Sequence, residues 1–314
     1  MRIGIVTDSA CDLPKQFIQD HNIVIMPISI RSGDSLLTDR RDPVETLEFY
    51  EQHLADPANT HESIPFSALQ IEELFLTRLV TDFDYVFCIT VSSTRSKIHE
   101  NAMQASFKIL SKYKAIRKAA NIVGPFMLRV VDSKNFFTGQ GVMVAEAAEM
   151  LRRGANTMEI YRRLEQLTAT TYAYLMPAEL SHLRSNAKKK GDNSVSFFSY
   201  ALGTALDIKP ILLGHDGETG PVEKVRGFKN GVERLFKTAI AELERGLKCN
   251  IICISYGGDP DAITTLPGYD DLRIAARKKG VTILRSVMST TAAVNVGPGG
   301  LSIAFATEPH DIVK

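Results

Sequence analysis

The sequence predicts an α/β protein with a doubly wound, mostly parallel sheet, followed by a smaller α+β domain with a mixed sheet. In the first half, short apolar runs alternate with stretches whose apolar residues recur at helical spacing. Beyond about residue 168 the regular alternation ends, and the pattern predicts strands, a hairpin and longer helices. We therefore expect two domains, residues 1–168 and 169–314.

The first half divides into strands and helices in regular alternation. Strands are expected at 2–7, 23–30, 84–91 and 127–132. Helices are expected at 14–21, 43–55, 68–81, 96–113, 136–153 and 157–168. Within the helix at 96–113, apolar residues at steps of three and four form one face: Ile98, Ala102, Ala105 and Ile109.

The second half begins with a strand at 170–176 and two helices at 178–190 and 195–206. A hairpin joins strands at 208–213 and 222–227, because Gly214, Gly217 and Gly220 supply turn residues between them. A helix at 229–247 follows, and strands at 250–256 and 281–287 bracket a helix at about 260–279. The stretch Ala293–Phe305 is expected to be a glycine turn that leads into a last strand.

Composition excludes several classes of protein. Of 314 residues, 44% are hydrophobic and 23% charged, and the net charge of +1 gives no electrostatic reason to expect nucleic acid or an anionic membrane surface. The N-terminus lacks the layout of a signal peptide, and no apolar run approaches the roughly 20 residues of a membrane-spanning helix. We expect a cytoplasmic protein.

The four cysteines do not suggest a disulfide or a metal site. Cys11 lies in the first loop and Cys88 within a strand, while Cys249 and Cys253 fall on one late strand. Residues four apart on a strand are separated by about 13 Å, too far for a disulfide or a shared zinc ion. Cys88 and Cys253 are interpreted as small buried apolar residues, and no metal or cofactor is expected.

Short polar side chains follow three of the predicted strands. Thr7, Asp8 and Ser9 follow the first strand, the run Ser92–Ser96 follows the third, and Asp132–Lys134 follows the fourth. In an open α/β sheet, ligands bind outside the carboxyl ends of the strands, where the strand order switches. The three ends should therefore converge on one crevice that binds a small ligand through hydroxyl and backbone N–H groups.

Five short motifs then follow one another along nearly the whole chain. They are Val6–Leu13, Val131–Lys134 with Gly139 and Gly141, Asp207–Ile211, Lys224–Arg226 and Gly297–Gly299. In order and spacing they resemble the DegV family of fatty-acid-binding proteins. The resemblance implies two domains that bury an acyl chain between them, with its carboxylate held by serine and threonine hydroxyls. It also implies a carrier rather than an enzyme, since some members present the fatty acid to a separate kinase.

Two family motifs match only in part. The family's Thr-Ser-x-Pro-Ser loop aligns with Glu62–Phe66, where Ser63 and Pro65 match. In its serine-rich loop Ser92, Ser93 and Ser96 match, whereas Lys97 and Ile98 replace Gly-Thr. The histidine before Gly-Pro-Gly is Asn295 here, and the segment Lys188–Ser194 replaces Gly-Gly-Arg-Ile. The resemblance thus implies these ligand-binding residues: Ser63, Ser92, Ser93, Ser96 and Asn295.

Other interpretations remain open. The serines near Ser96 also suit a helix cap, and Asp132–Ser133 suits a structural turn. A hydrolase or phosphotransferase acting on a small anion at the same crevice is the alternative function, although the chain has no Gly-x-Ser-x-Gly, P-loop or His-Glu-x-x-His motif. The basic run Arg184–Lys190 would serve a nucleic-acid binder, but four basic residues on one helix more often form a solvated face. Residues that suit either an acyl tunnel or ordinary core are Phe197, Phe198, Ile208 and Ile211.

Overall fold

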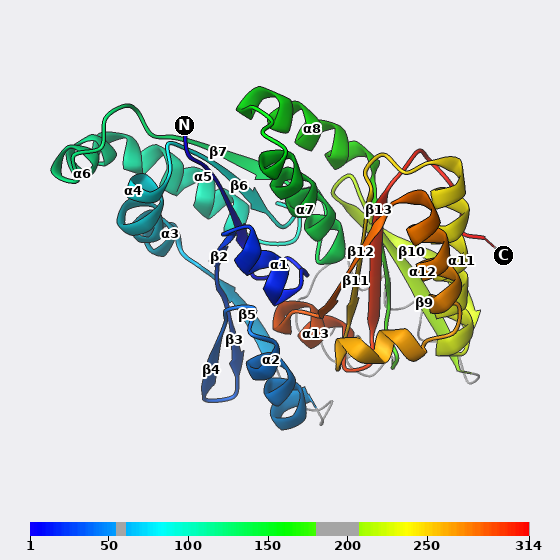
Figure 1. Ribbon diagram of the computed structural model, residues 1–314. Helices are drawn as coiled ribbons and strands as arrows, with labels where there is room; N and C mark the ends of the chain where they lie inside the picture. Colours follow the sequence, from blue (N-terminus) through cyan, green and yellow to red (C-terminus); the bar gives the residue numbers. More distant parts are fainter. Residues whose placement is uncertain (55–60, 180–206, 314) are drawn as a thin grey trace.

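A computed structural model of the chain describes residues 1–54, 61–179 and 207–313 (Figure 1). A four-stranded parallel sheet has the order β2-β1-β6-β7. Its strands are β1 (Ile3–Asp8), β2 (Val24–Met26), β6 (Tyr85–Thr90) and β7 (Met127–Asp132). The predicted parallel sheet is confirmed.

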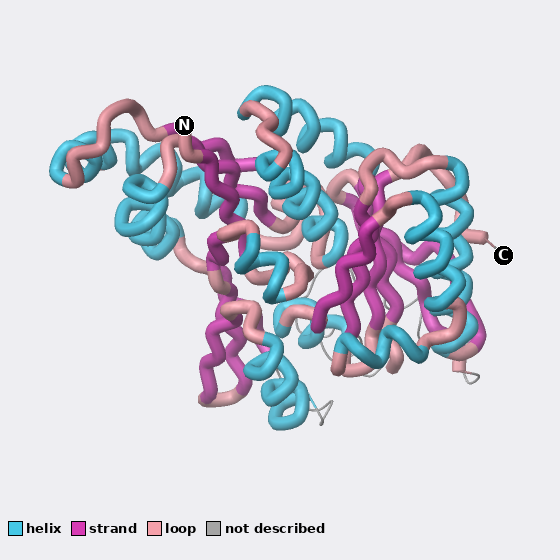
Figure 2. The backbone as a smooth tube through the Cα atoms, in the orientation of Figure 1, coloured by secondary structure: helices cyan, strands magenta, loops and turns pink. Residues whose placement is uncertain are grey.

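A six-stranded mixed sheet has the order β10-β9-β8-β13-β11-β12, and only its β11–β12 pair is parallel. Its strands are β8 (Thr171–Met176), β9 (Ile208–His215), β10 (Glu218–Arg226), β11 (Ile251–Tyr256), β12 (Thr282–Val287) and β13 (Leu301–Ala306). The mixed sheet of the second half is confirmed, and Figure 2 shows it standing apart from the parallel sheet. The predicted domain boundary falls in α8 (Thr157–Thr170), just before β8, and stays a prediction.

One helix lies between these two sheets. Helix α7 (Thr138–Arg152) packs on β1 and β6 of the parallel sheet and on β8, β11 and β13 of the mixed sheet (Figure 1). Every residue from Thr138 to Ala148 is buried, as expected for a helix enclosed on all sides. Helices α11 (Phe228–Arg245) and α12 (Tyr269–Lys279) cover the other face of the mixed sheet.

A three-stranded antiparallel sheet of order β4-β3-β5 was not predicted. Its strands are β3 (Ile28–Ser32), β4 (Ser35–Asp39) and β5 (His61–Pro65). The single strand expected at 23–30 is wrong, because it divides at Pro27 into β2 and β3, which belong to different sheets. Proline has no N–H for the ladder, so a continuous strand is interrupted there.

Two helix predictions and one turn prediction also need correction. The helix expected at 96–113 ends at Lys108 as α5 (Ile98–Lys108), and a separate α6 (Tyr113–Ala119) follows a 3₁₀ turn, Ile109–Ser111. The helix expected at 260–279 divides into a 3₁₀ turn (Pro260–Thr265) and α12, because Pro267 and Gly268 lie between them. The expected glycine turn at Ala293 is instead the end of α13 (Thr290–Val296).

The remaining described helices match the predicted positions. They are α1 (Lys15–Asp20), α2 (Pro43–Phe49) with a π-helix (Tyr50–Leu54), α3 (Ala68–Leu74) with a π-helix (Phe75–Leu79) and α4 (Val80–Asp82), and α8. The helices expected at 178–190 and 195–206 fall almost wholly outside the described residues, as do Phe197, Phe198 and the Arg184–Lys190 run. Across the described ranges, no helix has both the length and the apolarity needed to cross a bilayer.

The apolar core is continuous between the two larger sheets. A single buried cluster includes Val6 and Val86 from the parallel sheet, Val144 from α7, and Cys253 and Ala304 from the mixed sheet. All four cysteines are free and buried, which confirms the burial predicted for Cys88 and Cys253. Cys249 precedes β11 rather than lying on it. The two sheets therefore share a hydrophobic core across α7.

Candidate functional site

The carboxyl ends of three parallel strands meet at one edge of the sheet. From β1 the chain passes to β2 on one side and later to β6 on the other, so the strand order switches between β1 and β6. The Val91 N–H donates to Asp8 Oδ2 at 2.7 Å, and the Ser93 N–H donates to Asp132 Oδ1 at 3.2 Å. The predicted convergence is confirmed by these bonds.

Asp8 is the buried centre of this edge. Its carboxylate also accepts from the Ala10 N–H at 3.1 Å and from Nε2 of Gln140, on α7, at 3.1 Å. Burial raises the pKa of Asp8 to about 6, with the hydrogen bonds from Val91, Gln140 and Ala10 opposing the rise. Gln140 Nε2 lies 2.9 Å from Thr7 Oγ1 as well, so α7 is bonded directly to the end of β1.

Helix α7 reaches this edge through an unusual backbone conformation. Phe137, the residue before α7, has φ 47° and ψ −112°, a combination rarely adopted by a residue with a side chain. Its carbonyl accepts from the Asp12 N–H at 3.2 Å. Four residues later, a Cβ on Gly141 would lie 2.8 Å from the backbone oxygen of Asp12. The start of α7 is therefore pressed against the loop after β1.

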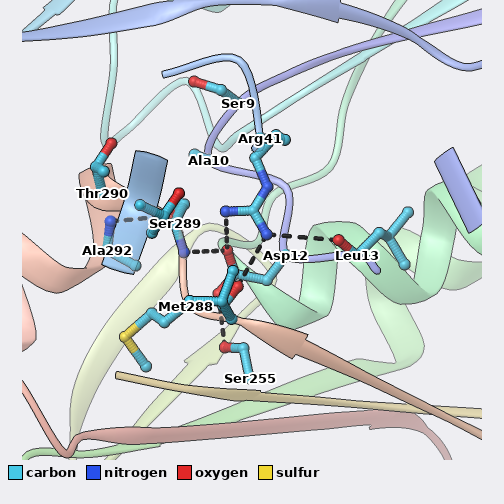
Figure 3. A network of polar contacts seen from close by, with 12 residues as sticks. Ser9, Ala10, Asp12, Leu13, Arg41, Ser255, Met288, Ser289, Thr290 and Ala292 are labelled. Atoms are coloured by element: carbon cyan, nitrogen blue, oxygen red, sulfur yellow. Dashed lines mark hydrogen bonds and ion pairs between the residues drawn. The ribbon is translucent and has the colours of Figure 1, made fainter. Parts of the chain in front are cut away.

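That loop carries a buried ion pair that joins both halves of the chain (Figure 3). Asp12 Oδ2 accepts from the Ser255 hydroxyl at 2.6 Å, and Asp12 Oδ1 accepts from the Ser289 N–H at 2.9 Å. Arg41 Nη1 lies 3.6 Å from Asp12 Oδ1, and Arg41 Nη2 donates to the Val287 carbonyl at 2.9 Å. Burial raises the pKa of Asp12, and the Arg41 charge opposes this only in part.

Three further buried hydrogen bonds reinforce the same junction. Asp39 Oδ2 accepts from the Thr290 hydroxyl at 2.6 Å and from its N–H at 3.1 Å. The Tyr50 hydroxyl donates to the Met288 carbonyl. Sequence reasoning did not identify Arg41, Ser289 or Thr290. A signal was present, because Ser289 and Thr290 follow the end of a strand just as Ser9 follows β1.

The predicted serines after β6 occupy three different environments. Ser92 is buried, and its hydroxyl lies 2.9 Å from that of Thr94. Because the Thr94 hydroxyl donates to the Gly217 carbonyl at 2.7 Å, it must accept from Ser92. This chain of bonds connects the loop to the β9–β10 hairpin. Ser93 is exposed, whereas the Ser96 hydroxyl accepts from the Ile98 N–H at 3.2 Å and so supports the start of α5.

Ser63 and Asn295 lie on elements that both contact β3. Ser63 is on strand β5, paired with Ile30, rather than in the expected loop. The Asn101 side chain donates to the Phe66 carbonyl at 2.8 Å, which brings the end of β5 to the first turns of α5. Asn295 is on α13, which packs on β3, and its amide donates to the Thr291 carbonyl at 2.7 Å.

The five predicted residues lie on three separate parts of the chain: strand β5, the loop after β6 and helix α13. In the described part of the chain no side-chain hydrogen bond joins any two of them, although the Ser96 N–H donates to the Ser92 carbonyl at 3.2 Å. The hydroxyls of Ser63 and Ser93 have no hydrogen-bond partner among the described residues. These two hydroxyls are the ones available to a ligand without loss of an existing bond.

Comparison with known proteins identifies the family. The family described as "Uncharacterised protein, DegV family" matches residues 2–308. A DegV domain-containing protein of Xanthomonas axonopodis pv. citri is 50% identical over 310 residues, covering 99% of each chain. The chain belongs to the DegV family.

Solved structures of the DegV family share this fold. A fatty acid (stearic acid)-binding protein from Eubacterium ventriosum superposes with a TM-score of 0.77 at 21% identity, covering 98% of both chains. DegV from Bacillus subtilis, described as a fatty acid binding protein, gives a TM-score of 0.75 at 21% identity over 98% of this chain and 100% of that one.

Several glycines of the DegV motifs occupy positions where a side chain would clash with a neighbour or strain the backbone. A Cβ on Gly139 would lie 2.1 Å from Oδ1 of Asn135, whose Nδ2 donates to the Thr171 carbonyl at 3.0 Å. In the Gly297–Gly299 motif, Gly297 and Gly299 have φ of 89° and 74°, in the region that favours glycine. These motifs therefore shape the junction between the two sheets.

A metal cluster and an activated thiol are two kinds of reactive site that an enzyme could use. No three histidine, cysteine, aspartate or glutamate side chains within them lie close enough to share a metal ion. Burial raises the pKa of the Cys11 thiol far above its ordinary value, with Asp8 adding to the effect. A thiol held neutral in this way is a poor nucleophile.

Proposed function

We propose that this protein is a cytoplasmic carrier that binds a long-chain fatty acid between the parallel and mixed sheets. The observation that carries the proposal is the likeness, over nearly the whole chain, to DegV proteins described as binding fatty acids, one of them stearic acid. Burial of about sixteen carbons would contribute roughly 12 kcal/mol before the costs of binding, at about 0.8 kcal/mol per methylene.

In this proposal serine hydroxyls hold the carboxylate. Ser63 and Ser93 donate directly, since their hydroxyls have no partner within the described residues. The Ser92 hydroxyl also donates to the carboxylate after giving up its hydrogen bond to the Thr94 hydroxyl. Ser96 and Asn295 supply further polar groups around the carboxylate. A buried carboxylate needs such donors, because an unpaired charge is costly in an apolar environment.

The proposal has a second part, that this carrier presents its bound fatty acid to a separate kinase. It rests on the family resemblance, and Asn295 marks where this chain departs from it by replacing a histidine. With a fatty acid kinase of a DegV system and ATP, the loaded protein should yield acyl phosphate, and Asn295→His should raise the rate. If the wild-type protein gives no product, this part of the proposal is wrong while fatty-acid binding is unaffected.

The first test is native mass spectrometry of the purified protein before and after organic extraction. We expect a bound mass equal to that of a fatty acid, lost on extraction and regained when oleate is added. A protein that is empty as purified and takes up none of a series of fatty acids would contradict the proposal.

The second test removes two of the serine hydroxyls. Ser63→Ala with Ser92→Ala should weaken fatty-acid affinity by roughly tenfold or more for each lost hydrogen bond to the charged carboxylate, at about 1.5–3 kcal/mol per bond. The matched control is Ser106→Ala with Ser111→Ala, whose hydroxyls donate to carbonyls of their own helical turns. Equal affinities in both double variants, with both still folded by circular dichroism, would refute the assignment of these serines.

A further inference from the structure

In one stretch of the chain all charged residues are basic, although the net charge of the whole chain is only +1. Residues 101–131 contain no aspartate or glutamate. They contain six basic residues: Lys108, Lys112, Lys114, Arg117, Lys118 and Arg129. The nearly neutral net charge therefore hides a local excess of positive charge. From the net charge we expected no electrostatic attraction to anionic membranes, but this segment can be attracted to them.

Most of this stretch forms one end of the molecule, which we call the lysine tip (residues 107–126). It comprises the end of α5, the following 3₁₀ turn, α6 and the loop that leads to β7, on the far side of the molecule from α11 and α12 (Figure 1). Three large apolar side chains project from it: Phe107 is 65% exposed, Leu110 57% and Val123 95%. Phe107 and Leu110 are three residues apart, at the end of α5 and in the turn after it, and Val123 lies in the loop before β7. One end of the molecule therefore carries three exposed apolar side chains, which makes it a candidate interaction surface.

The projecting loop is held firmly by a buried guanidinium. Arg117 is 2% exposed and donates to the carbonyls of Gly124 at 3.0 Å and Val123 at 3.4 Å. It also pairs with Asp84 at 2.8 Å and donates to the Val80 and Phe83 carbonyls at 2.9 and 2.8 Å. Val123 is therefore fixed in its exposed position by buried bonds.

An open hollow of about 460 Å³ lies beside Val123, lined by Tyr113, Lys114, Lys118, Asn121 and Ile122 among others. Lys114 and Lys118 are exposed and one helical turn apart. Among the described residues neither makes an ion pair, and the nearby carboxylates already have partners: Glu72 pairs with Lys112 at 2.5 Å, and Asp84 with Arg117 and Arg2. The two lysine charges are thus left for a ligand.

We propose that the lysine tip docks on the surface of a bilayer containing anionic phospholipid. Val123, Phe107 and Leu110 enter the headgroup region, and the lysines neutralise lipid phosphates. Lysine is depleted at protein–protein interfaces, where arginine and aromatic residues dominate. The four exposed lysines around apolar side chains therefore favour a membrane over an acidic protein partner. This proposal goes beyond fatty-acid binding and does not depend on it.

The test is sedimentation of the full chain with vesicles of phosphatidylcholine, with and without an equal part of phosphatidylglycerol. We expect binding only to the anionic vesicles, weakened by high salt. Lys114→Gln with Lys118→Gln and Val123→Ser should lower the affinity by more than about 25-fold, since each lysine near an anionic surface contributes roughly fivefold.

The matched control is Lys229→Gln with Lys278→Gln and Ile274→Ser, which removes two exposed lysines and an exposed apolar side chain from α11 and α12. It should bind like the wild type. Failure of the wild type to bind anionic vesicles would overturn the proposal, as would an equal loss in both triple variants. Binding of the tip to an acidic protein from the same cells, without binding to vesicles, would likewise replace it.

Discussion

Asp8 is a buried carboxylate whose described hydrogen-bond partners, Val91 N–H, Ala10 N–H and the Gln140 amide, are all neutral. Burial raises its pKa from 3.8 to about 6. The folded state therefore binds more protons than the unfolded state between these values, so the contribution of Asp8 to stability is greatest at low pH and falls as pH rises through about 6. At neutral pH the charged Asp8 lowers stability by up to about 3 kcal/mol, at about 1.4 kcal/mol per pKa unit.

Asp8→Asn should remove this pH dependence. The amide oxygen still accepts from the Val91 N–H, but no charge is buried at neutral pH. Urea unfolding from pH 4 to 7 should show the variant gaining up to about 3 kcal/mol relative to wild type as pH rises. Asp34→Asn, in an exposed hairpin turn, is the control and should follow the wild type at every pH. Parallel pH curves for wild type and Asp8→Asn would contradict the raised pKa.

At the scale of the elements, the packing of α7 depends on the absence of a side chain at Gly141. Gly141 faces the backbone oxygen of Asp12, which cannot rotate away from an added methyl group as a side chain would. Gly141→Ala should destabilise the protein by about 1–3 kcal/mol, as overpacking does, despite the better helix propensity of alanine. The control is Gly220→Ala on β10, where a Cβ has nothing within 4 Å. If thermal unfolding gives the two variants the same midpoint, α7 does not need this close approach.

Elements with strong apolar periodicity could be predicted from sequence, and those defined by distant partners could not. The strands β1, β6 and β7 are apolar runs, and the polar residues at their ends do meet. Strand β4 is short and largely exposed, so its pattern carries little signal. The serine motifs also indicated Ser92 and Ser93 as ligand-binding residues, which stays a prediction. Arg41 was missed because its partner Val287 is 246 residues away, and no local pattern reports such a contact.

At the scale of the whole molecule, the Asp12–Arg41 pair ties the first loop of the chain to the last two strands before α13. The pair is imperfect: the closest approach is 3.6 Å, and among the described residues Arg41 Nε and Nη1 have no hydrogen-bond acceptor. A buried pair with such geometry recovers little more than the cost of burying its charges. Its removal as a pair should therefore cost much less than the loss of either partner alone.

A double-mutant cycle tests this. Arg41→Met leaves the Asp12 charge buried and alone, and Asp12→Asn leaves Arg41 alone, so each should cost about 3–5 kcal/mol. Together they remove both charges of the pair, and the amide oxygen introduced by Asp12→Asn can still accept from the Ser289 N–H. The double variant should thus be more stable than either single variant, as measured by urea unfolding. Additive losses would mean that the two residues act independently and that the ion pair does not couple them.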